Sequence, residues 1–75
     1  MDDISNSQLE FGIFCVENIA LKLGIRGDKV YKLLTEASDI LDTYIMEYYE
    51  TLHTQSKEYI VNDIIEYMQS AEVLK

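Results

Sequence analysis

The sequence predicts an all-α fold, a compact bundle of four short helices. Apolar residues recur at helical spacings of three and four, and no apolar-polar alternation is bounded by turn residues as in a strand. The chain has no proline and only three glycines, so little interrupts a helix. Apolar residues make up 48% of the 75 residues, which is enough for one domain with one core. Such a small core typically supplies only about 3–5 kcal/mol of net stability.

The first helix is predicted over about residues 5–23. Its apolar face follows steps of four and three at Leu9, Ile13, Val16, Ala20 and Leu23, with Phe14 and Leu21 widening the stripe. Ser5 or Ser7 can cap its start by accepting from free backbone amides. Gly24 ends it, because glycine adopts the conformation that follows a helix at low cost.

A second helix is predicted over about residues 28–37 and a third over about 40–50. The apolar positions of the second are Val30, Leu33, Leu34 and Ala37, and the inward face of the third is Leu41, Tyr44, Ile45 and Tyr48. Asp28 suits the positive end of the second helix dipole. Ser38 and Asp39 offer a cap for the third helix.

A fourth helix is predicted over about residues 56–70. Small polar residues from Thr51 to Ser56 interrupt the apolar pattern and indicate a connection, in which Thr54 or Ser56 can cap the helix. The broad apolar face that follows consists of Ile60, Val61, Ile64, Ile65 and Met68.

The junction of the first two helices has the spacing of a helix-turn-helix. Ala20, Gly24 and Val30 place a small residue, a turn glycine and a branched anchor where that motif needs them. Four bases lie on or near this junction, at Lys22, Arg26, Lys29 and Lys32. The spacing therefore keeps open an alternative function, a DNA-binding regulator that uses residues 22–32.

The charge balance disfavours that alternative. Fourteen Asp and Glu against six Lys and Arg give a net charge of −8, which repels phosphate backbones and anionic membranes. Outside residues 22–32, thirteen acids face two bases. The second helix also offers no Gln, Asn or Arg, the usual readers of base edges.

The sequence predicts a cytoplasmic protein. Met1-Asp2-Asp3 lacks the basic start of a signal peptide, and no apolar run approaches the roughly 20 residues that span a bilayer. The single cysteine, Cys15, lies within an apolar pattern and is expected to be a buried, reduced thiol.

The sequence indicates no enzyme, no cofactor and no metal site. The chain has one His and one Cys, and it contains no phosphate-binding loop and no nucleophile elbow. Acidic pairs at Glu47 and Glu50 and at Asp63 and Glu66 are most simply solvated helix faces.

The most distinctive stretch runs from Leu52 to Ile64 and reads L-H-T-Q-S-K-E-Y-I-V-N-D-I. It resembles a family of very small bacterial proteins of unknown function whose C-terminal half carries L-H-T-Q-x-K-E-Y-I-V-x-D-I. Residues 14–17 and 27–34 also resemble this family, so the resemblance covers about residues 8–70. The chain departs from the pattern at Ser56, where glycine is expected, and at Arg26, where a serine cap is expected.

This resemblance implies a context rather than a reaction. Members look like companions encoded beside a larger protein, sometimes one similar to ADP-ribosyltransferase toxins. An antitoxin-like or adaptor role would follow. An acidic protein is suited to cover a basic or NAD-binding cleft.

The second half of the chain carries the predicted partner surface. Five of the six tyrosines lie there, more than so small a bundle can bury, and exposed tyrosine is enriched at protein interfaces. The predicted partner-binding residues are Tyr48, Tyr49, His53, Thr54, Gln55, Lys57, Tyr59 and Asp63. The sequence therefore predicts a small protein-binding module, and its marginal core also makes a homodimer plausible. Structural roles compete at several of these positions: a helix cap at Thr54, and a buried hydroxyl of Tyr59 with Asp63 as its acceptor.

Overall fold

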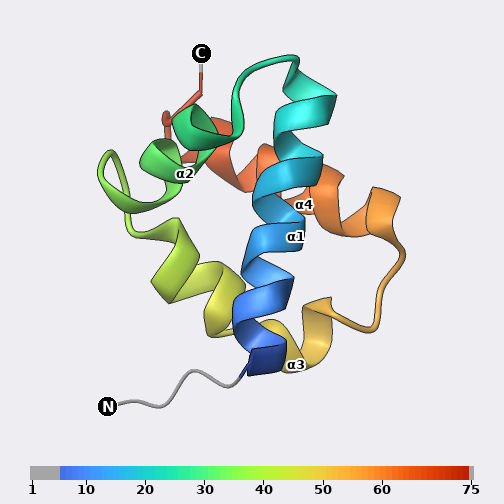
Figure 1. Ribbon diagram of the computed structural model, residues 1–75. Helices are drawn as coiled ribbons and strands as arrows, with labels where there is room; N and C mark the ends of the chain where they lie inside the picture. The colour runs from blue at the N-terminus through green and yellow to red at the C-terminus, as the bar shows by residue number, and fades with distance from the viewer. Residues whose placement is uncertain (1–5, 75) are drawn as a thin grey trace.

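The computed structural model describes residues 6–74, and this part of the chain contains five helices and no strand. In chain order they are α1 (Asn6–Leu23), α2 (Gly27–Thr35), η1 (Leu41–Met46), α3 (Tyr49–Leu52) and α4 (Lys57–Ser70). Figure 1 shows α1 running through the middle of the molecule. It contacts α2, η1 and α4, so it forms the centre of the fold. The predicted all-α class is confirmed.

The junction after α1 has the conformation that the sequence predicted. Gly24 has a φ of 71°, and its amide and that of Ile25 both donate to the carbonyl of Ala20. This left-handed residue costs least at glycine, which explains why α1 stops there. At the other end, Ser7 lies inside α1 and so is not its cap. Ser5, the alternative cap, and Met1-Asp2-Asp3 lie outside the described residues.

The buried face of α1 differs from the predicted one. Phe11, Cys15 and Ile19 face the core, whereas Leu9 and Ile13 of the predicted stripe are 54% and 52% exposed. Leu21, Phe14 and Val16 also lie outside the buried set, and Leu21 is exposed. The reason is that α1 is apolar on more than one side, so its own periodicity does not determine which side packs against the other helices.

The second helix ends earlier than predicted. α2 stops at Thr35, and the amides of Glu36 and Ala37 both donate to the carbonyl of Lys32. The hydroxyl of Ser38 donates to the carbonyl of Leu33 at 2.7 Å and so satisfies one of the last free acceptors of the helix. Ala37 is consequently exposed rather than part of the apolar face, which Val30 and Leu34 provide.

The prediction of one third helix over about residues 40–50 is wrong. In its place η1 is a π-helix, and Tyr48, with φ −103° and ψ 22°, separates it from the single turn of α3. Ile45 of η1 and Leu52 of α3 are buried, so each short piece anchors itself in the core. Tyr48, predicted to face inward, is 51% exposed because it lies at the break between them.

The last helix has the predicted core face. Ile60, Val61, Ile64, Ile65 and Met68 are all buried. Ser56 is its N-cap: its hydroxyl accepts from the amide of Tyr59 at 3.1 Å. The hydroxyl of Thr54, the other candidate, donates to the carbonyl of Thr51 instead. Ser56 has a φ of −68°, so the position does not require glycine.

Candidate functional site

A hydrogen bond between two polar side chains joins η1 to α4. The hydroxyl of Tyr44 donates to Oδ2 of Asp63, and both residues are partly buried. Burial raises the pKa of the Tyr44 hydroxyl above its usual value, and the bond to the Asp63 carboxylate raises it further. The hydroxyl therefore stays protonated and serves as a fixed donor to this carboxylate.

Tyrosine rings surround this hydrogen bond. The ring of Tyr44 lies 4.4 Å from that of Tyr67 and 5.3 Å from that of Tyr48, centroid to centroid, with tilts of 36° and 55°. Such tilted pairs are favourable aromatic arrangements. Tyr67 and Tyr48 remain 41% and 51% exposed, and Tyr59, one turn before Asp63 on α4, is 53% exposed. We call Tyr44, Tyr48, Tyr59, Asp63 and Tyr67 the tyrosine surface.

A small hollow adjoins Asp63 at this surface. It has a volume of about 210 Å³ and is lined by Tyr59, Asn62, Asp63 and Glu66, all from α4. Two carboxylates, an amide and an aromatic ring thus meet at one place. This combination suits a hydrogen-bond donor that carries positive charge.

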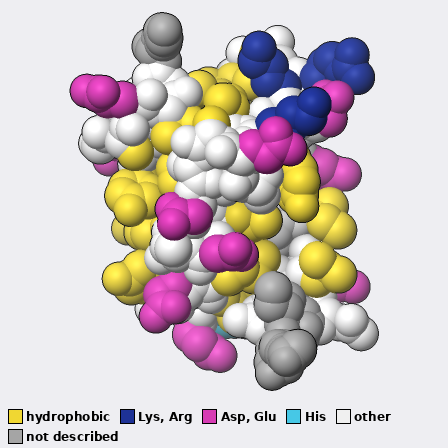
Figure 2. Space-filling model, turned by 90° about the vertical axis from the view of Figure 1, so that its left-hand side faces the viewer, with side chains coloured by type: hydrophobic (Ala, Val, Ile, Leu, Met, Phe, Trp, Pro, Cys, Tyr) yellow, Lys and Arg dark blue, Asp and Glu magenta, His cyan; other side chains and the backbone are white. Residues whose placement is uncertain are grey.

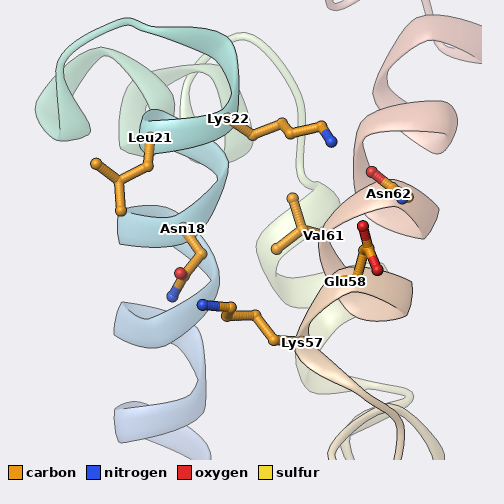
Figure 3. A pocket seen from close by; sticks show the side chains of 7 residues that line it. All are labelled: Asn18, Leu21, Lys22, Lys57, Glu58, Val61 and Asn62. Atoms are coloured by element: carbon orange, nitrogen blue, oxygen red, sulfur yellow. The ribbon is translucent and has the colours of Figure 1, made fainter.

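Figure 3 shows a second hollow, of about 410 Å³, between α1 and α4. Lys57 extends from α4 toward Asn18 on α1, while Lys22 extends from α1 toward α4. Glu58 lines the same hollow. The amide of Asn18 already donates to the carbonyl of Phe14 at 2.8 Å. Lys57 lines this hollow and not the one beside Asp63, although Asn62 borders both.

The predicted basic cluster is divided between two places. Lys22 lines the hollow between α1 and α4, whereas Arg26, Lys29 and Lys32 line another hollow along α2. The guanidinium of Arg26 donates twice to Asp28, at 3.1 Å each, and so is partly neutralised. Figure 2 shows Lys and Arg gathered at one upper corner of the face it presents, with Asp and Glu spread over much of the rest.

An apolar hollow lies on the side of α1 that sequence reasoning assigned to the core. It has a volume of about 300 Å³ and lies between α1, η1 and the start of α2. Leu9, Ile13 and Tyr31 line it and remain more than half exposed. Gly12 also lines it, and a Cβ added there would lie 2.7 Å from Cε of Met46, the end of a flexible side chain that would have to shift.

The single cysteine has the surroundings of a core residue. Cys15 has no exposed surface, and burial raises its pKa from 9.0 to about 12, so it remains a neutral thiol. His53 is exposed and stacks on Tyr49, with ring centroids 4.4 Å apart. Within residues 6–74, no three His, Cys, Asp or Glu side chains form a group that could hold a metal ion. None of the described helices is long and apolar enough to cross a membrane.

Comparison with protein families identifies the family of this chain. The model of a family described as a protein of unknown function, DUF3791, matches residues 10–71. The chain belongs to the DUF3791 family. Comparisons with curated proteins and with solved structures found no match. Membership in DUF3791 thus identifies the kind of chain without identifying an activity.

The distinctive stretch of this DUF3791 chain serves two purposes. Leu52, Ile60, Val61 and Ile64 are buried, so four of its thirteen residues build the core. His53, Thr54, Gln55, Lys57 and Tyr59 are exposed. The exposed part extends over the connection and the start of α4, so it does not form one compact site.

The predicted partner residues of the DUF3791 chain are only partly brought together. Tyr48, Tyr59 and Asp63 lie on the tyrosine surface. Tyr49 instead packs edge-on against Phe11, at 5.4 Å between centroids, and stacks on His53. Its role includes fixing α3 to α1.

Sequence reasoning left two members of the tyrosine surface out of its partner-binding residues. The sequence placed Tyr44 on the inward face of the third helix. In the structure its hydroxyl donates a hydrogen bond to Asp63. Tyr67 packs against the ring of Tyr44 from α4 in a tilted arrangement. A signal was present, because Tyr44 and Tyr48 are four apart, as are Tyr59, Asp63 and Tyr67, and residues four apart share a helix face.

Proposed function

We propose that this chain is a small cytoplasmic protein-binding module and that its partner contacts the tyrosine surface. The observation that carries the proposal is the exposure of Tyr48, Tyr59 and Tyr67 around one hydrogen-bonded carboxylate. Tyrosine rings are rigid and bury large apolar area at low entropic cost. Covering these rings with a partner is therefore favourable, and their hydroxyls can form directional hydrogen bonds with it.

The partner is proposed to be a larger companion protein. The resemblance described above implies proteins encoded beside a larger one, in some cases similar to ADP-ribosyltransferase toxins. An antitoxin-like or adaptor role follows if this chain covers a basic cleft of such a partner. Its net charge of −8 supports association with a positively charged surface.

The experiment that tests this proposal is capture of the partner from native lysate with matched tyrosine variants. Tyr59→Ala and Tyr31→Ala remove the same side chain at positions 53% and 52% exposed, on α4 and α2 respectively. We expect Tyr59→Ala to reduce recovery of the partner, identified by mass spectrometry, and Tyr31→Ala to leave it unchanged. Equal recovery with both variants, at unchanged helicity, would contradict a role for the tyrosine surface.

A second candidate function is DNA binding through the junction of α1 and α2. The observation that favours it is the conformation of that junction, in which Ala20 and Val30 are buried around Gly24. In this alternative α2 is the recognition helix, with Lys29 and Lys32 near phosphates. The division of the basic cluster weakens it, because Lys22 lines a different hollow.

Charge reversal separates the two functions. Lys29→Glu with Lys32→Glu should abolish a gel shift if the chain binds DNA, and it should leave partner capture unchanged if the chain acts through the tyrosine surface. Absence of any complex with the unmodified chain, even at low salt, would end the DNA-binding alternative.

A further inference from the structure

The tyrosine surface combines aromatic faces with carboxylates in a way that favours one kind of ligand group. Tyr48 and Tyr67 flank Tyr44 with tilted rings, so parts of their faces stay open to solvent. The face of an aromatic ring is negative and attracts a cation placed over it. Neutral apolar groups would gain burial here, but they would leave the neighbouring carboxylates without a partner.

Asp63 can hold such a cation in place. Its Oδ2 accepts from Tyr44, which fixes the orientation of the carboxylate and leaves Oδ1 for a second donor. Glu66 lines the same hollow, three residues further along α4. At about 210 Å³, the hollow has room for the end of one long side chain.

The surroundings carry the matching charge. From Leu41 to Leu74 the chain has seven Asp and Glu side chains and one base, Lys57. That lysine lines the hollow between α1 and α4, which shares Asn62 with the hollow beside Asp63. The field near Asp63 and Glu66 is therefore negative, which attracts basic segments and repels phosphate groups.

We infer that the tyrosine surface binds an arginine side chain from a basic segment of the partner, with the guanidinium seated between the tyrosine rings and Asp63. This inference rests on the proposed function and names the chemistry of the partner. Guanidinium is planar, so it stacks on tyrosine while its edge donates two hydrogen bonds to a carboxylate. The ammonium of lysine is compact and strongly hydrated, so it gains less from the same rings.

The test is a titration of the full chain with three peptides of equal length: hexa-arginine, hexa-lysine and hexa-glutamate. Binding is followed at about 0.15 M salt through the NMR signals of the tyrosine rings, since exposed charges further apart than the Debye length are screened there. We expect hexa-arginine to bind about fivefold more tightly than hexa-lysine, as cation–π contacts of this kind allow. Hexa-glutamate should not bind. The signals of Tyr48, Tyr59 and Tyr67 should move most.

Two pairs of variants give the inference its controls. Asp63→Asn keeps an acceptor for Tyr44 but removes the charge, and it should weaken hexa-arginine binding by about tenfold. Glu58→Gln makes the same charge change on the same helix, at the hollow that Lys22 and Lys57 line, and should change binding little. Tyr59→Leu should lower the preference for arginine over lysine, whereas Tyr31→Leu should leave it unchanged.

The outcomes distinguish the inference from the proposed function. Equal affinity for arginine and lysine peptides, or equal losses in Asp63→Asn and Glu58→Gln, would overturn it in favour of general charge attraction. Absence of peptide binding would also overturn it, and the proposed function would still stand if Tyr59→Ala lowered partner capture. If both Tyr59→Ala and Tyr31→Ala captured the partner as well as the unmodified chain does, that result would instead contradict the proposed function itself.

Discussion

Ile13 and Ile19 are the same residue type on one helix, and they have opposite surroundings. Ile19 has no exposed surface, whereas Ile13 is 52% exposed at the edge of the apolar hollow. The difference arises because α2, η1 and α4 pack around one side of α1. Burial, not residue type, therefore determines what each side chain contributes to stability.

A matched pair of substitutions tests this assignment. Ile19→Val should lower the free energy of unfolding by about 1 kcal/mol, because it removes a methyl group from a packed core. Ile13→Val should change it by less than about 0.5 kcal/mol, as exposed positions usually do. Urea unfolding followed by circular dichroism gives both values. The reverse order would mean that the predicted stripe through Leu9 and Ile13 is the true core face.

Burial of Cys15 makes the stability of the fold depend on pH in the alkaline range. Its pKa is raised by burial from 9.0 to about 12, so the thiol of the unfolded chain ionises first as the pH rises. Stability from this residue is fully present below about pH 9 and is lost between about pH 9 and pH 12. Tyr44, whose pKa is also raised, contributes in the same direction at high pH.

We therefore expect the free energy of unfolding to fall as the pH increases above about 9. In Cys15→Ala the fall should be shallower, because one of the two groups no longer titrates. Urea unfolding at a series of alkaline pH values measures both slopes. Parallel slopes in the two proteins would show that Cys15 ionises equally in the folded and unfolded chains.

At the scale of the elements, the starts of α2 and α4 form a natural comparison. Ser56 caps α4 by accepting from the amide of Tyr59. Arg26 stands at the equivalent position of α2 and has the extended conformation of a cap, with φ −74° and ψ 150°, but its side chain makes no cap hydrogen bond. It binds Asp28 instead, in an exposed ion pair of the kind that contributes little.

Arg26→Ser should consequently stabilise the chain, by about 0.5–1 kcal/mol, because a serine hydroxyl can accept from a free amide of α2. Ser56→Ala is the matched opposite and should destabilise by about 1 kcal/mol. Thermal unfolding of both variants beside the unmodified chain tests the pair. A destabilised Arg26→Ser would indicate that the bond from Arg26 to Asp28 matters more than a cap at this position.

The elements also differ in how far their sequences determine them. The core face of α4 follows from periodicity alone, because Ile60, Ile64 and Met68 form one continuous apolar stripe. The π-turns of η1 have no such signal. Their apolar residues fit an ordinary helix equally well, and the break at Tyr48 depends on how Ile45 and Leu52 each reach the core. Local patterns thus predict helices more reliably than they predict how helices are divided.

The residues of the candidate site also differ in how far the sequence predicts them. Tyr48, Tyr59 and Asp63 were predicted from residue type and spacing, and they do share one surface. Tyr44 was missed, because its partner is nineteen residues away on another helix. A pairing of this kind depends on the packing of η1 against α4, which a pattern within one segment cannot contain.

At the scale of the whole molecule, the charge is strongly negative and unevenly distributed along the chain. The chain has fourteen acids and six bases, and within residues 6–74 a salt bridge joins Arg26 to Asp28. The folded state concentrates the remaining acids, and this self-repulsion opposes folding. A basic partner would relieve it, which agrees with the chemistry inferred for the tyrosine surface.

Added salt should therefore stabilise this chain. Raising sodium chloride from about 0.01 M to about 0.15 M shortens the Debye length from about 30 Å to about 8 Å and screens repulsion across the molecule. We expect a gain on the order of 1 kcal/mol, or about 4–8 °C in melting temperature for a domain of this size. Thermal unfolding by circular dichroism at several salt concentrations measures it. Glu17→Gln with Glu47→Gln, two exposed positions, should reduce the response because less repulsion is left to screen. A melting temperature that falls with salt would mean that attractive ion pairs, rather than repulsion, dominate the folded state.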